Sequence, residues 1–560
     1  MYIRKHSLRF SLIFLAVIFC LLGFSIKLIF IQFFRSEHLA GLASKQHKHQ
    51  IELEPTRGTI FDRRMRPLGI SVPVYSLYAN PRMMKEEAKA KALEKLPELL
   101  SISPELLSKR LSRDKYFVWL ERKLSDEVAQ KVRALRIPGL DFIKESQRYY
   151  PNQYLAAHVI GFAGVDNQGL EGLELKFDKY LKGELGRTQI VRDARRRELL
   201  MDRAFVPPKD GFDLVLTIDE TIQYIAERAL DKAFKKHNAK SASIVVIDPG
   251  TGEILALANR PTYDLGEFTS STPESRTNRA VVYFYEPGSV FKIVTASAAL
   301  EEDIVTEKDK IFCENGKYRV GNHILHDHHP LGTLTFSEVI EQSSNIGTTK
   351  VAQMMGPAVF YKYAKRFGFG RKTGVDLIGE VSGQLKPPRK WSKTSIGALP
   401  IGQEVTVTPL QLACAIGAVA NDGVYMKPFV VKYIKDKNDE LIKAFEPKVI
   451  DRVVSIDTAR RVKAILQKVV EHGTGKKARV KGVAVGGKTG TAQKVVNGAY
   501  SHSKFYASFI GFAPVEDPRI AAVVVYDEPH PNHYGGTVAA PVFREMLVDT
   551  LKYIEASEYE

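Results

Sequence analysis

Residues 285–300 read YEPGSVFKIVTASAAL, and this stretch decides how the rest of the chain is interpreted. Pro287 and Gly288 break the preceding pattern, and Ser289 then begins an alanine-rich segment that predicts a helix. Serine is well suited to a helix start, so a purely structural interpretation is that Ser289 caps the helix. Lys292, however, lies three residues on and shares the same helical face. A serine nucleophile needs an adjacent base, and a buried lysine with a lowered pKa can act as one.

A second segment offers the polar groups that such a nucleophile needs. Ser343-Ser344-Asn345 interrupts SEVIEQSSNIGTTKVAQ (337–353) and predicts a turn between two helices. Ser343 brings a hydroxyl that can relay a proton, and Asn345 brings an amide that can donate and accept hydrogen bonds. Taken alone, the segment is more typical of a polar helix junction.

A third segment, Lys488-Thr489-Gly490-Thr491, lies on a predicted strand. Gly490 is expected to permit close approach of a substrate backbone, and an extended peptide can pair with a strand edge. Lys488, Thr489 and Thr491 are then expected to bind the terminal carboxylate of that peptide. The N–H groups of Ser289 and Thr491 are candidates for an oxyanion hole.

The Ser-x-x-Lys and Lys-Thr-Gly patterns also occur elsewhere in the chain, in contexts that do not indicate a site. Ser112 and Ser501 are each followed by a lysine three residues on, and Lys372-Thr373-Gly374 lies in a glycine-broken loop. The ordered set at 289, 343 and 488 therefore counts for more than any single motif.

In this order and context, the three segments resemble the motifs of the serine penicillin-recognising enzymes. RGTIFDR (57–63), RYYP (148–151) and GLEGLELKFDKYLKG (169–183) further resemble the pedestal of class B penicillin-binding proteins. We interpret Arg57, Asp62 and Arg63 as structural residues that tie the pedestal together by charge-assisted hydrogen bonds. Within class B, Ser-Ser-Asn is typical of the division transpeptidases, whereas elongation-type relatives more often carry aspartate at the place of Asn345, so elongation remains the alternative.

The resemblance implies a peptidoglycan D,D-transpeptidase. Ser289 would attack the penultimate D-Ala carbonyl of a stem peptide with Lys292 as base, and an amine from another stem would resolve the acyl-enzyme. No cofactor is needed, and β-lactams would acylate Ser289. A β-lactamase is disfavoured because no Glu-x-x-Leu-Asn segment lies between Asn345 and Lys488. A carboxypeptidase is disfavoured by the pedestal, and a β-lactam sensor or non-catalytic division scaffold stays open.

The N-terminus predicts a membrane anchor. Residues 10–26 read FSLIFLAVIFCLLGFSI, and the apolar pattern continues to Phe34, which is long enough to cross a hydrocarbon core as a helix. Arg4, Lys5 and Arg9 are expected to keep the leader cytoplasmic, and everything after residue 34 is expected outside the plasma membrane, at the division septum. The alternative is a secretory signal cleaved near residues 41–43.

The partners follow from this topology and from the resemblance. They are stem peptides and nascent glycan, a polytopic lipid II glycosyltransferase packed against the anchor, and other division proteins. The formal charge of +17 fits anionic lipid or wall polymer, and no motif of nucleic-acid recognition accompanies it. The cluster His323, His326, Asp327, His328 and His329 invites a metal site, but consecutive histidines cannot all face one ion, so we predict no metal.

The fold class expected is α+β. The predicted hairpin at 243–259, the strands near 483–528 and a closing helix from Val542 to about Ile554 suggest an antiparallel sheet flanked by helices. Helical spacing predicts helices at 86–100, 104–111 and 220–236. The expected domains are a leader (1–9), an anchor (10–34), a pedestal (35–210) and a transpeptidase domain (211–560).

Overall fold

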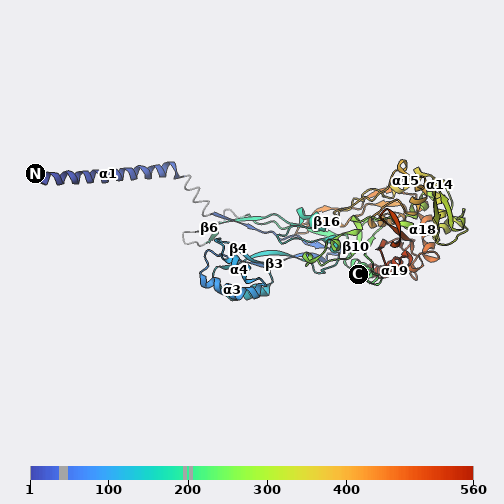
Figure 1. Cartoon of the computed structure of the whole chain (residues 1–560), viewed down its shortest axis with the longest axis horizontal. Helices are drawn as coiled ribbons and strands as arrows, with labels where there is room; N and C mark the ends of the chain where they lie inside the picture. Colours follow the sequence, from blue (N-terminus) through green and yellow to red (C-terminus); the bar gives the residue numbers. More distant parts are fainter. Residues whose placement is uncertain (1, 37–47, 193–197, 201–205, 559–560) are drawn as a thin grey trace. The chain divides into compact units, whose positions relative to one another are not determined.

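The structure is a computed structural model that describes residues 2–36, 48–192, 198–200 and 206–558 (Figure 1). The chain divides into two compact units. Unit 1 comprises Met1–Thr56 and Gly183–Asp210, and unit 2 comprises Arg57–Lys182 and Gly211–Glu560. The predicted domain boundaries, including the one at 210, stay predictions.

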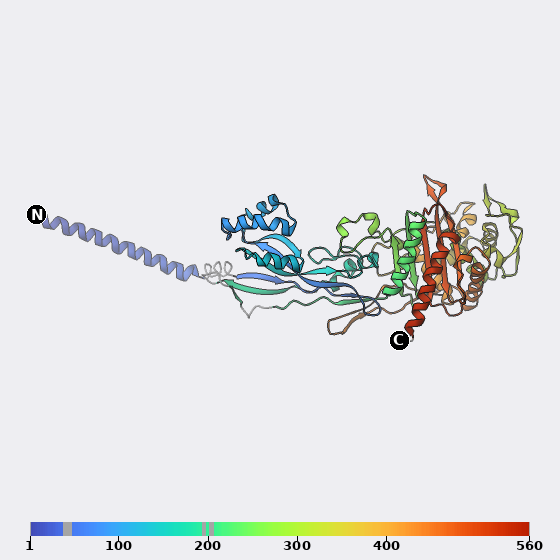
Figure 2. The same ribbon diagram turned by 90° about the horizontal axis from the view of Figure 1, so that it is seen from below.

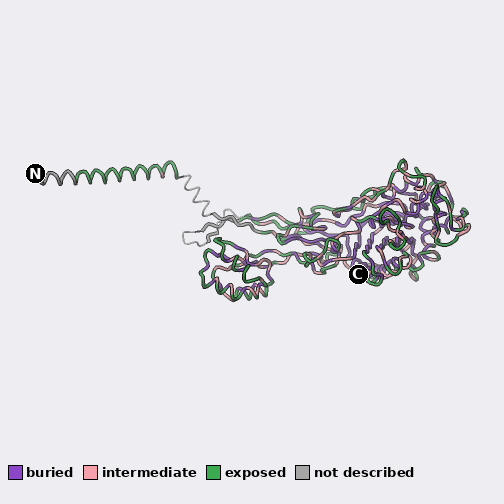
Figure 3. The backbone as a smooth tube through the Cα atoms, viewed as in Figure 1, coloured by how far each residue is buried: buried purple, intermediate pink, exposed green. Residues whose placement is uncertain are grey.

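Unit 1 contains the N-terminal helix and a small sheet. Helix α1 spans Tyr2–Phe34, and strands β1 (Lys48–Leu53), β6 (Gly186–Arg192) and β7 (Glu198–Leu200) pair in the order β1-β6-β7. The segment Phe10–Phe34 is long and apolar enough to cross a membrane, and almost all of its residues are exposed (Figure 3). Such a helix is consistent with a single-pass membrane protein. The alternative cleavage site at 41–43 lies outside the described residues.

The pedestal part of unit 2 is an antiparallel sheet with helices packed on it. Its elements are β2 (Ile60–Phe61), β3 (Pro67–Ala79), α3 (Glu86–Leu100), α4 (Pro104–Leu111), β4 (Val118–Leu124), α5 (Asp126–Ala134), β5 (Leu140–Tyr149), α6 (Ala157–Ile160), α7 (Gly172–Lys176) and α8 (Asp178–Leu181). Helices α3 and α4 confirm the predicted ranges. Their apolar faces, with Leu96 and Leu107 fully buried, share one core with β3 and β4.

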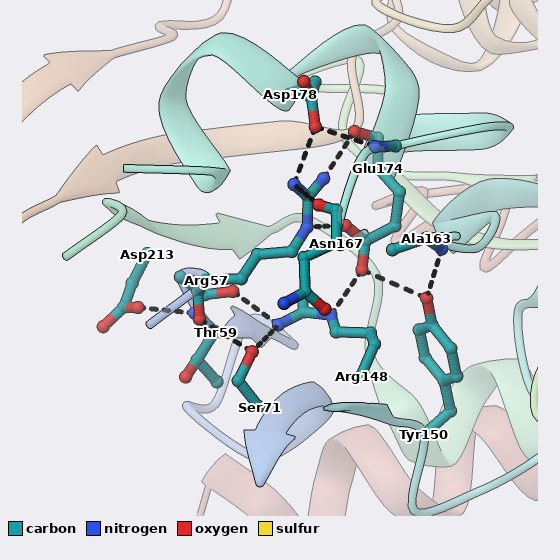
Figure 4. A network of polar contacts seen from close by, with 12 residues as sticks. Arg57, Thr59, Ser71, Arg148, Tyr150, Ala163, Asn167, Glu174, Asp178 and Asp213 are labelled. Atoms are coloured by element: carbon teal, nitrogen blue, oxygen red, sulfur yellow. Dashed lines mark hydrogen bonds and ion pairs between the residues drawn. The ribbon is translucent and has the colours of Figure 1, made fainter. Parts of the chain in front are cut away.

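A buried ionic network holds the pedestal part together (Figure 4). Arg57 donates to Glu174 Oε2 and to Asp178 Oδ1, both at 2.7 Å, and Arg148 donates to Glu174 Oε1 at 2.6 Å. Arg148 also donates to the carbonyl of Gly58 at 2.7 Å. The Arg57 contacts are the charge-assisted hydrogen bonds expected of it, and they join residues more than a hundred positions apart.

Asp62 and Arg63 also form the contacts expected of them. The Asp62 carboxylate accepts hydrogen bonds from Arg66 and from the backbone N–H groups of Arg64 and Arg66. Arg63 pairs with Glu253 at 2.9 Å. Glu253 belongs to the catalytic part of unit 2, so this ion pair links the two parts of the unit.

The catalytic part is built on a five-stranded antiparallel sheet. Strands β9 (Ser241–Ile247), β10 (Ile254–Arg260), β19 (Gly486–Val496), β20 (Ala499–Ala513) and β21 (Ile520–Asp527) pair in the order β10-β9-β21-β20-β19. The predicted hairpin of β9 and β10 is confirmed. Every residue of β9, β10 and β21 is buried, because helices cover both faces of the sheet (Figure 3).

Two helical layers enclose this sheet. Helices α9 (Glu220–Lys236) and α19 (Gly535–Glu558) cover one face (Figure 2). The other face packs against a larger layer that contains α12 (Lys292–Glu301), α13 (Phe336–Glu341), α14 (Asn345–Met355), α15 (Pro357–Arg366), α17 (Pro409–Ala420) and α18 (Ile456–Glu471). The α+β prediction is confirmed.

Short elements connect these layers. The short helices are η2 (Phe268–Ser270), α10 (Pro273–Arg276), α11 (Arg279–Val282), η3 (Gly288–Phe291), η4 (Glu314–Gly316), η5 (Pro388–Lys390), α16 (Ser395–Ala398), η6 (Leu399–Ile401) and η7 (Lys476–Ala478). The strand pairs are β11 (Lys310–Phe312) with β14 (Thr333–Thr335), β12 (Lys317–Val320) with β13 (His323–His326), and β15 (Val424–Met426) with β18 (Val449–Arg452).

The predicted closing helix was wrong at its start. The prediction began it at Val542, directly after Pro541, a residue type that lacks a backbone N–H and usually ends a helix. In the structure α19 begins at Gly535 and continues through Pro541. Val538, Ala539 and Ala540 are fully or almost fully buried in the core between α19 and the sheet, and this burial outweighs the missing hydrogen bond.

The two parts of unit 2 share a sheet. Strand β8 (Asp213–Leu216) pairs in parallel with β2 of the pedestal part and antiparallel with β16 (Val431–Lys435) of the catalytic part. The full order is β17-β16-β8-β2-β3-β4, in which β17 spans Leu441–Ala444 and β5 pairs with β3. Continuous backbone pairing therefore crosses from the pedestal part into the catalytic part.

Candidate active site

Ser289 lies in the turn that leads into α12. The turn is the 3-10 helix η3, its N-cap is Pro287, and Ser289 lies inside it. The capping interpretation of Ser289 is therefore not what the structure shows. Ser289 is half-buried, while Val290 and Phe291 beside it are fully buried and anchor the turn.

Two glycines allow η3 to pack tightly against strand β19. Gly288 has φ +60°, and a Cβ there would lie 3.1 Å from the Thr491 carbonyl oxygen. A Cβ on Gly490 would lie 2.9 Å from Val290 Cγ1 and 3.0 Å from the Pro287 carbonyl oxygen. The nearest atom to that Cβ would be Ser508 Oγ on the neighbouring strand, at 2.3 Å. The glycine therefore lets the strand pack against the turn that carries Ser289, and the expected approach of a substrate backbone stays a prediction.

Lys292 is fully buried and faces the junction between α13 and α14. Its Nζ donates to the Ser343 carbonyl oxygen at 2.6 Å, to Asn345 Oδ1 at 2.8 Å and to Ser343 Oγ at 3.2 Å. Ser343 has φ +60°, a turn conformation that brings both of its oxygens to the lysine. Burial lowers the pKa of Lys292 to about 7, although the charge of Asp327 acts in the opposite direction. Lys292 is therefore substantially neutral at physiological pH.

Lys488 reaches the same hydroxyl from strand β19. Its Nζ donates to Ser343 Oγ at 2.8 Å and to the carbonyl oxygen of Thr489 at 3.1 Å. Burial, and secondly the charge of Lys292, hold the pKa of Lys488 well below its usual value. The Ser343 hydroxyl thus joins two lysine amines, which is the geometry of a proton relay.

The remaining residues of the third motif occupy different positions. The Thr489 hydroxyl is hydrogen-bonded to the Thr474 hydroxyl at 2.7 Å. The Thr491 hydroxyl oxygen accepts the N–H of Gly535, the first residue of α19, at 3.1 Å. Thr491 lines a cavity, and Thr489 is not among the residues that line it.

A cavity of about 320 Å³ brings the predicted groups together. Ser289, Asn345 and Thr491 line it, so residues from all three motifs converge on one space. A volume of this size lies at the lower end of the range for small-ligand sites. Ser289, Asn345 and Thr491 therefore lie around one cavity, and Lys292 and Lys488 meet at Ser343.

Further residues of this cavity were not predicted as site residues. They are His326 at the end of β13, Asp327 and His328 after it, Gln403 after η6, Phe505 on β20, and His533 and Tyr534 before α19. The His533 ring stacks on Phe505 with centroids 4.0 Å apart. These residues come from four distant segments, and no sequence spacing links them, so only the fold brings them to the site.

Comparisons with known proteins agree with this geometry. Residues 242–548 match the penicillin-binding protein transpeptidase domain, and residues 52–216 match the penicillin-binding protein dimerisation domain. The chain is 36% identical to Stage V sporulation protein D of Bacillus subtilis, over 98% of this chain and 86% of that protein. It is 33% identical to the peptidoglycan D,D-transpeptidase FtsI of Escherichia coli, over 90% of this chain and 84% of that protein.

A solved structure gives the same result. Penicillin binding protein 3 of Mycobacterium tuberculosis, complexed with aztreonam, is 28% identical with a TM-score of 0.71, over 90% of this chain and 97% of that chain. The chain belongs to the class B penicillin-binding proteins. The predicted activity, that of a serine peptidoglycan D,D-transpeptidase which binds stem peptides and β-lactams, is confirmed at the level of the family.

In this class B penicillin-binding protein, Asp327 holds the start of helix α14. Its carboxylate accepts hydrogen bonds from the Ser344 hydroxyl at 2.7 Å and from the N–H of Ile346 at 3.1 Å, and also binds the N–H of Asn345. An anion at a helix N-terminus is stabilising, so Asp327 fixes the start of α14 and with it Asn345. Among the residues that the structure describes, no group of three or more His, Cys, Asp and Glu is placed to hold a metal ion.

The second Lys-Thr-Gly sequence of this penicillin-binding protein has a local role. The Thr373 N–H and hydroxyl both donate to Glu380 Oε1 at 2.6 Å, and the Gly374 N–H donates to Glu380 Oε2 at 3.1 Å. Lys372-Thr373-Gly374 therefore belongs to a loop that is held closed by the carboxylate of Glu380.

Proposed function

We propose that this chain cross-links peptidoglycan stem peptides with Ser289 as nucleophile and Lys292 as its base. The observation that carries the proposal is the set of hydrogen bonds joining Lys292 and Lys488 through Ser343, beside a cavity that Ser289 lines. A serine hydroxyl needs a neutral base nearby, and the burial-lowered pKa of Lys292 supplies one at neutral pH.

The reaction proceeds in two transfers. Ser289 Oγ bonds to the penultimate D-Ala carbonyl carbon while its proton passes to Lys292. The C–N bond to the terminal D-Ala then breaks, and the leaving amine takes a proton through Ser343 and the lysine pair. In the second transfer an amine from another stem forms the new C–N bond, the ester bond to Ser289 breaks, and the hydroxyl recovers its proton.

Lys488, Thr489, Gly490 and Thr491 have supporting roles in this proposal. The backbone N–H groups of Ser289 and Thr491 stabilise the oxyanion, because the carbonyl of Thr491 lies beside η3 and both residues line the cavity. Lys488 and Thr491 attract the terminal carboxylate of the donor stem, while Thr489 orients the strand through Thr474.

A penicillin-labelling experiment tests the nucleophile. The full-length protein in detergent is treated with a fluorescent penicillin, and labelling is expected to be lost in Ser289→Ala. Ser112→Ala is the matched control, because Ser112 also precedes a lysine by three residues but lies exposed on the pedestal part. Labelling that survives in Ser289→Ala would overturn the assignment.

The cellular role proposed is septal wall synthesis. The chain is anchored in the plasma membrane by α1 with its N-terminus cytoplasmic and its catalytic part extracytoplasmic. A polytopic lipid II glycosyltransferase contacts α1, and other division proteins contact the pedestal part. FtsI of Escherichia coli, at 33% identity, supports this role, whereas the sporulation relative favours a second candidate, wall synthesis during sporulation.

Depletion in the native host separates these roles. Filamentation is expected for a division enzyme, rounding for an elongation enzyme, and normal growth with defective spores for a sporulation enzyme. A β-lactam sensor would still acylate but would not transfer a stem peptide to an amine, so a cross-linking assay separates the enzyme from a sensor.

A further inference from the structure

A second cavity adjoins the catalytic one. It measures about 260 Å³, and Gln403 lines both spaces. Its wall includes His323 of β13, Thr394 before α16, Glu404 and Tyr500. The first transfer needs only the donor stem, but the second needs another peptide at the same serine, so a space that shares Gln403 with the catalytic cavity has a clear candidate occupant.

Backbone contacts place the wall of this second cavity beside the nucleophile. The Gly288 N–H donates to the Gly402 carbonyl at 3.1 Å, and a Cβ on Gly402 would lie 2.1 Å from the Gly288 carbonyl oxygen. Tyr285 pairs with Val407 on the same two segments. The segment 285–288 before Ser289 and the segment 402–407 therefore run side by side.

Two carboxylates lie next to this contact. Glu286 lies two residues before Gly288, and Glu404 lies two residues after Gly402. The Glu404 N–H donates to Glu286 Oε1 at 3.0 Å. The Tyr500 hydroxyl donates to the same oxygen at 3.3 Å, and the Ser395 hydroxyl donates to Glu404 Oε2. Neither carboxylate forms an ion pair with any residue in the described part of the chain.

The second oxygen of Glu286 lacks a partner. Glu286 Oε2 is buried and accepts no hydrogen bond from any of the residues that the structure describes. Burial raises the pKa of Glu286, although hydrogen bonds from Glu404 and Tyr500 act in the opposite direction. A buried acceptor left without a donor costs free energy, and a cation bound nearby offsets part of that cost.

The polar groups beside the two cavities differ in kind. Lys292 and Lys488 lie behind the catalytic cavity, and their amines offer N–H donors to the terminal carboxylate of the donor stem. Glu286 and Glu404 attract a cation and repel that same carboxylate. This asymmetry favours one orientation for each peptide, with the donor carboxylate on the lysine side and an amine on the glutamate side.

We propose that the cavity lined by Gln403, Glu404 and Tyr500, with Glu286 behind it, binds the primary ammonium group of the acceptor stem peptide. The inference rests on the proposed transpeptidase function and adds the place where the second substrate binds. Glu404 and Glu286 hold the cation beside the acyl-enzyme, and the ammonium gives up one proton to the neutral amine of Lys292 before its nitrogen attacks the ester.

The test separates acylation from transfer to the amine. Full-length protein in detergent is acylated by a stem pentapeptide, and a lysine-containing tripeptide competes with water for the acyl-enzyme. In Glu404→Gln and Glu286→Gln, the tripeptide concentration that gives half-maximal transfer is expected to rise about tenfold, because a hydrogen bond to a charged group is lost. The rate of acylation by a fluorescent penicillin is expected to stay within about twofold, since the donor side keeps its contacts.

Two controls keep the result interpretable. Hydroxylamine is an uncharged nucleophile at neutral pH, so transfer to it is expected to be unchanged in both glutamate variants. Asp457→Asn removes a carboxylate of α18 that is 83% exposed and is expected to change neither reaction. Unchanged competition by the tripeptide, or an equal loss of transfer to hydroxylamine, would overturn the acceptor site. Loss of penicillin labelling in Ser289→Ala would still support the nucleophile in either case.

Discussion

Two regions of unit 2 bury basic side chains, one with carboxylate partners and the other without them. In the pedestal part, Arg57 is 1% exposed and is paired with Glu174 and Asp178, while Arg148 shares the same Glu174. In the catalytic part, Lys292 and Lys488 are fully buried, and neither forms an ion pair with a described carboxylate.

The pKa directions follow from this difference. For Arg57 burial acts to lower the pKa, but the charge of Glu174 and the hydrogen bonds of both carboxylates outweigh it and raise the pKa. For Lys292 and Lys488 burial dominates, and the pKa falls. A buried cation with carboxylate partners stabilises structure, whereas one without them becomes a base.

The largest effect is expected when the base, Lys292, is removed. Lys292→Met keeps the side-chain volume but loses the amine, so penicillin acylation is expected to slow by about 10²- to 10⁴-fold, the usual contribution of a general base. The melting temperature is expected to shift by only about 3 °C, because removal of a buried amine offsets the lost hydrogen bonds. Stopped-flow acylation and thermal unfolding measure the two quantities. A Lys292→Met variant with a much lower melting temperature but a native acylation rate at low temperature would contradict the assignment of Lys292 as base.

The second largest effect is expected when the shared carboxylate of the pedestal part, Glu174, is removed. Glu174→Gln leaves Arg57 and Arg148 buried without their common partner, which is expected to cost about 3–5 kcal/mol of unfolding free energy. Denaturant unfolding measures it, and penicillin acylation below the transition should be retained. The matched control is Glu127→Gln in the exposed pair with Lys131, where no measurable loss of stability is expected. Equal losses in both variants would show that burial does not decide the strength of these pairs.

The smallest effect is a shift in pH dependence. Lys292 acts as a base only when neutral, so acylation is expected to rise about tenfold between pH 6 and pH 8, with its midpoint near the pKa of about 7. The Asp327 charge raises the pKa of Lys292, so Asp327→Asn is expected to move the midpoint to lower pH. An acylation rate that does not vary with pH in the native protein would contradict the assignment of Lys292 as base.

Motifs with local chemistry could be predicted from the sequence. Ser289, Lys292, Ser343, Asn345 and Lys488 each belong to a short segment whose residue types and context indicate a site. Helices α3, α4 and α9 were predictable to the residue, because their apolar spacing and flanking residues mark both ends.

Features that depend on long-range packing could not be predicted. Asp327 stood out only as part of a histidine cluster, and its bond to the start of α14 requires the fold. Helix α19 begins at Gly535, directly after Tyr534, which lines the cavity. A start on the N-terminal side of Pro541 is not expected from the sequence, because proline is unusual inside a helix. The Asn497-Gly498 turn that joins β19 and β20 was detectable, since Asn-Gly is a strong hairpin signal that we did not use.

The shared sheet of unit 2 has a practical consequence for anyone who shortens this protein. A fragment that starts at residue 211 would keep β8 and β16 but lose β2, which pairs with the other side of β8. The bare edge would present unsatisfied N–H and C=O groups to other molecules and favour aggregation. Soluble fragments for crystallisation or inhibitor screening should therefore begin before Arg57 and retain the pedestal.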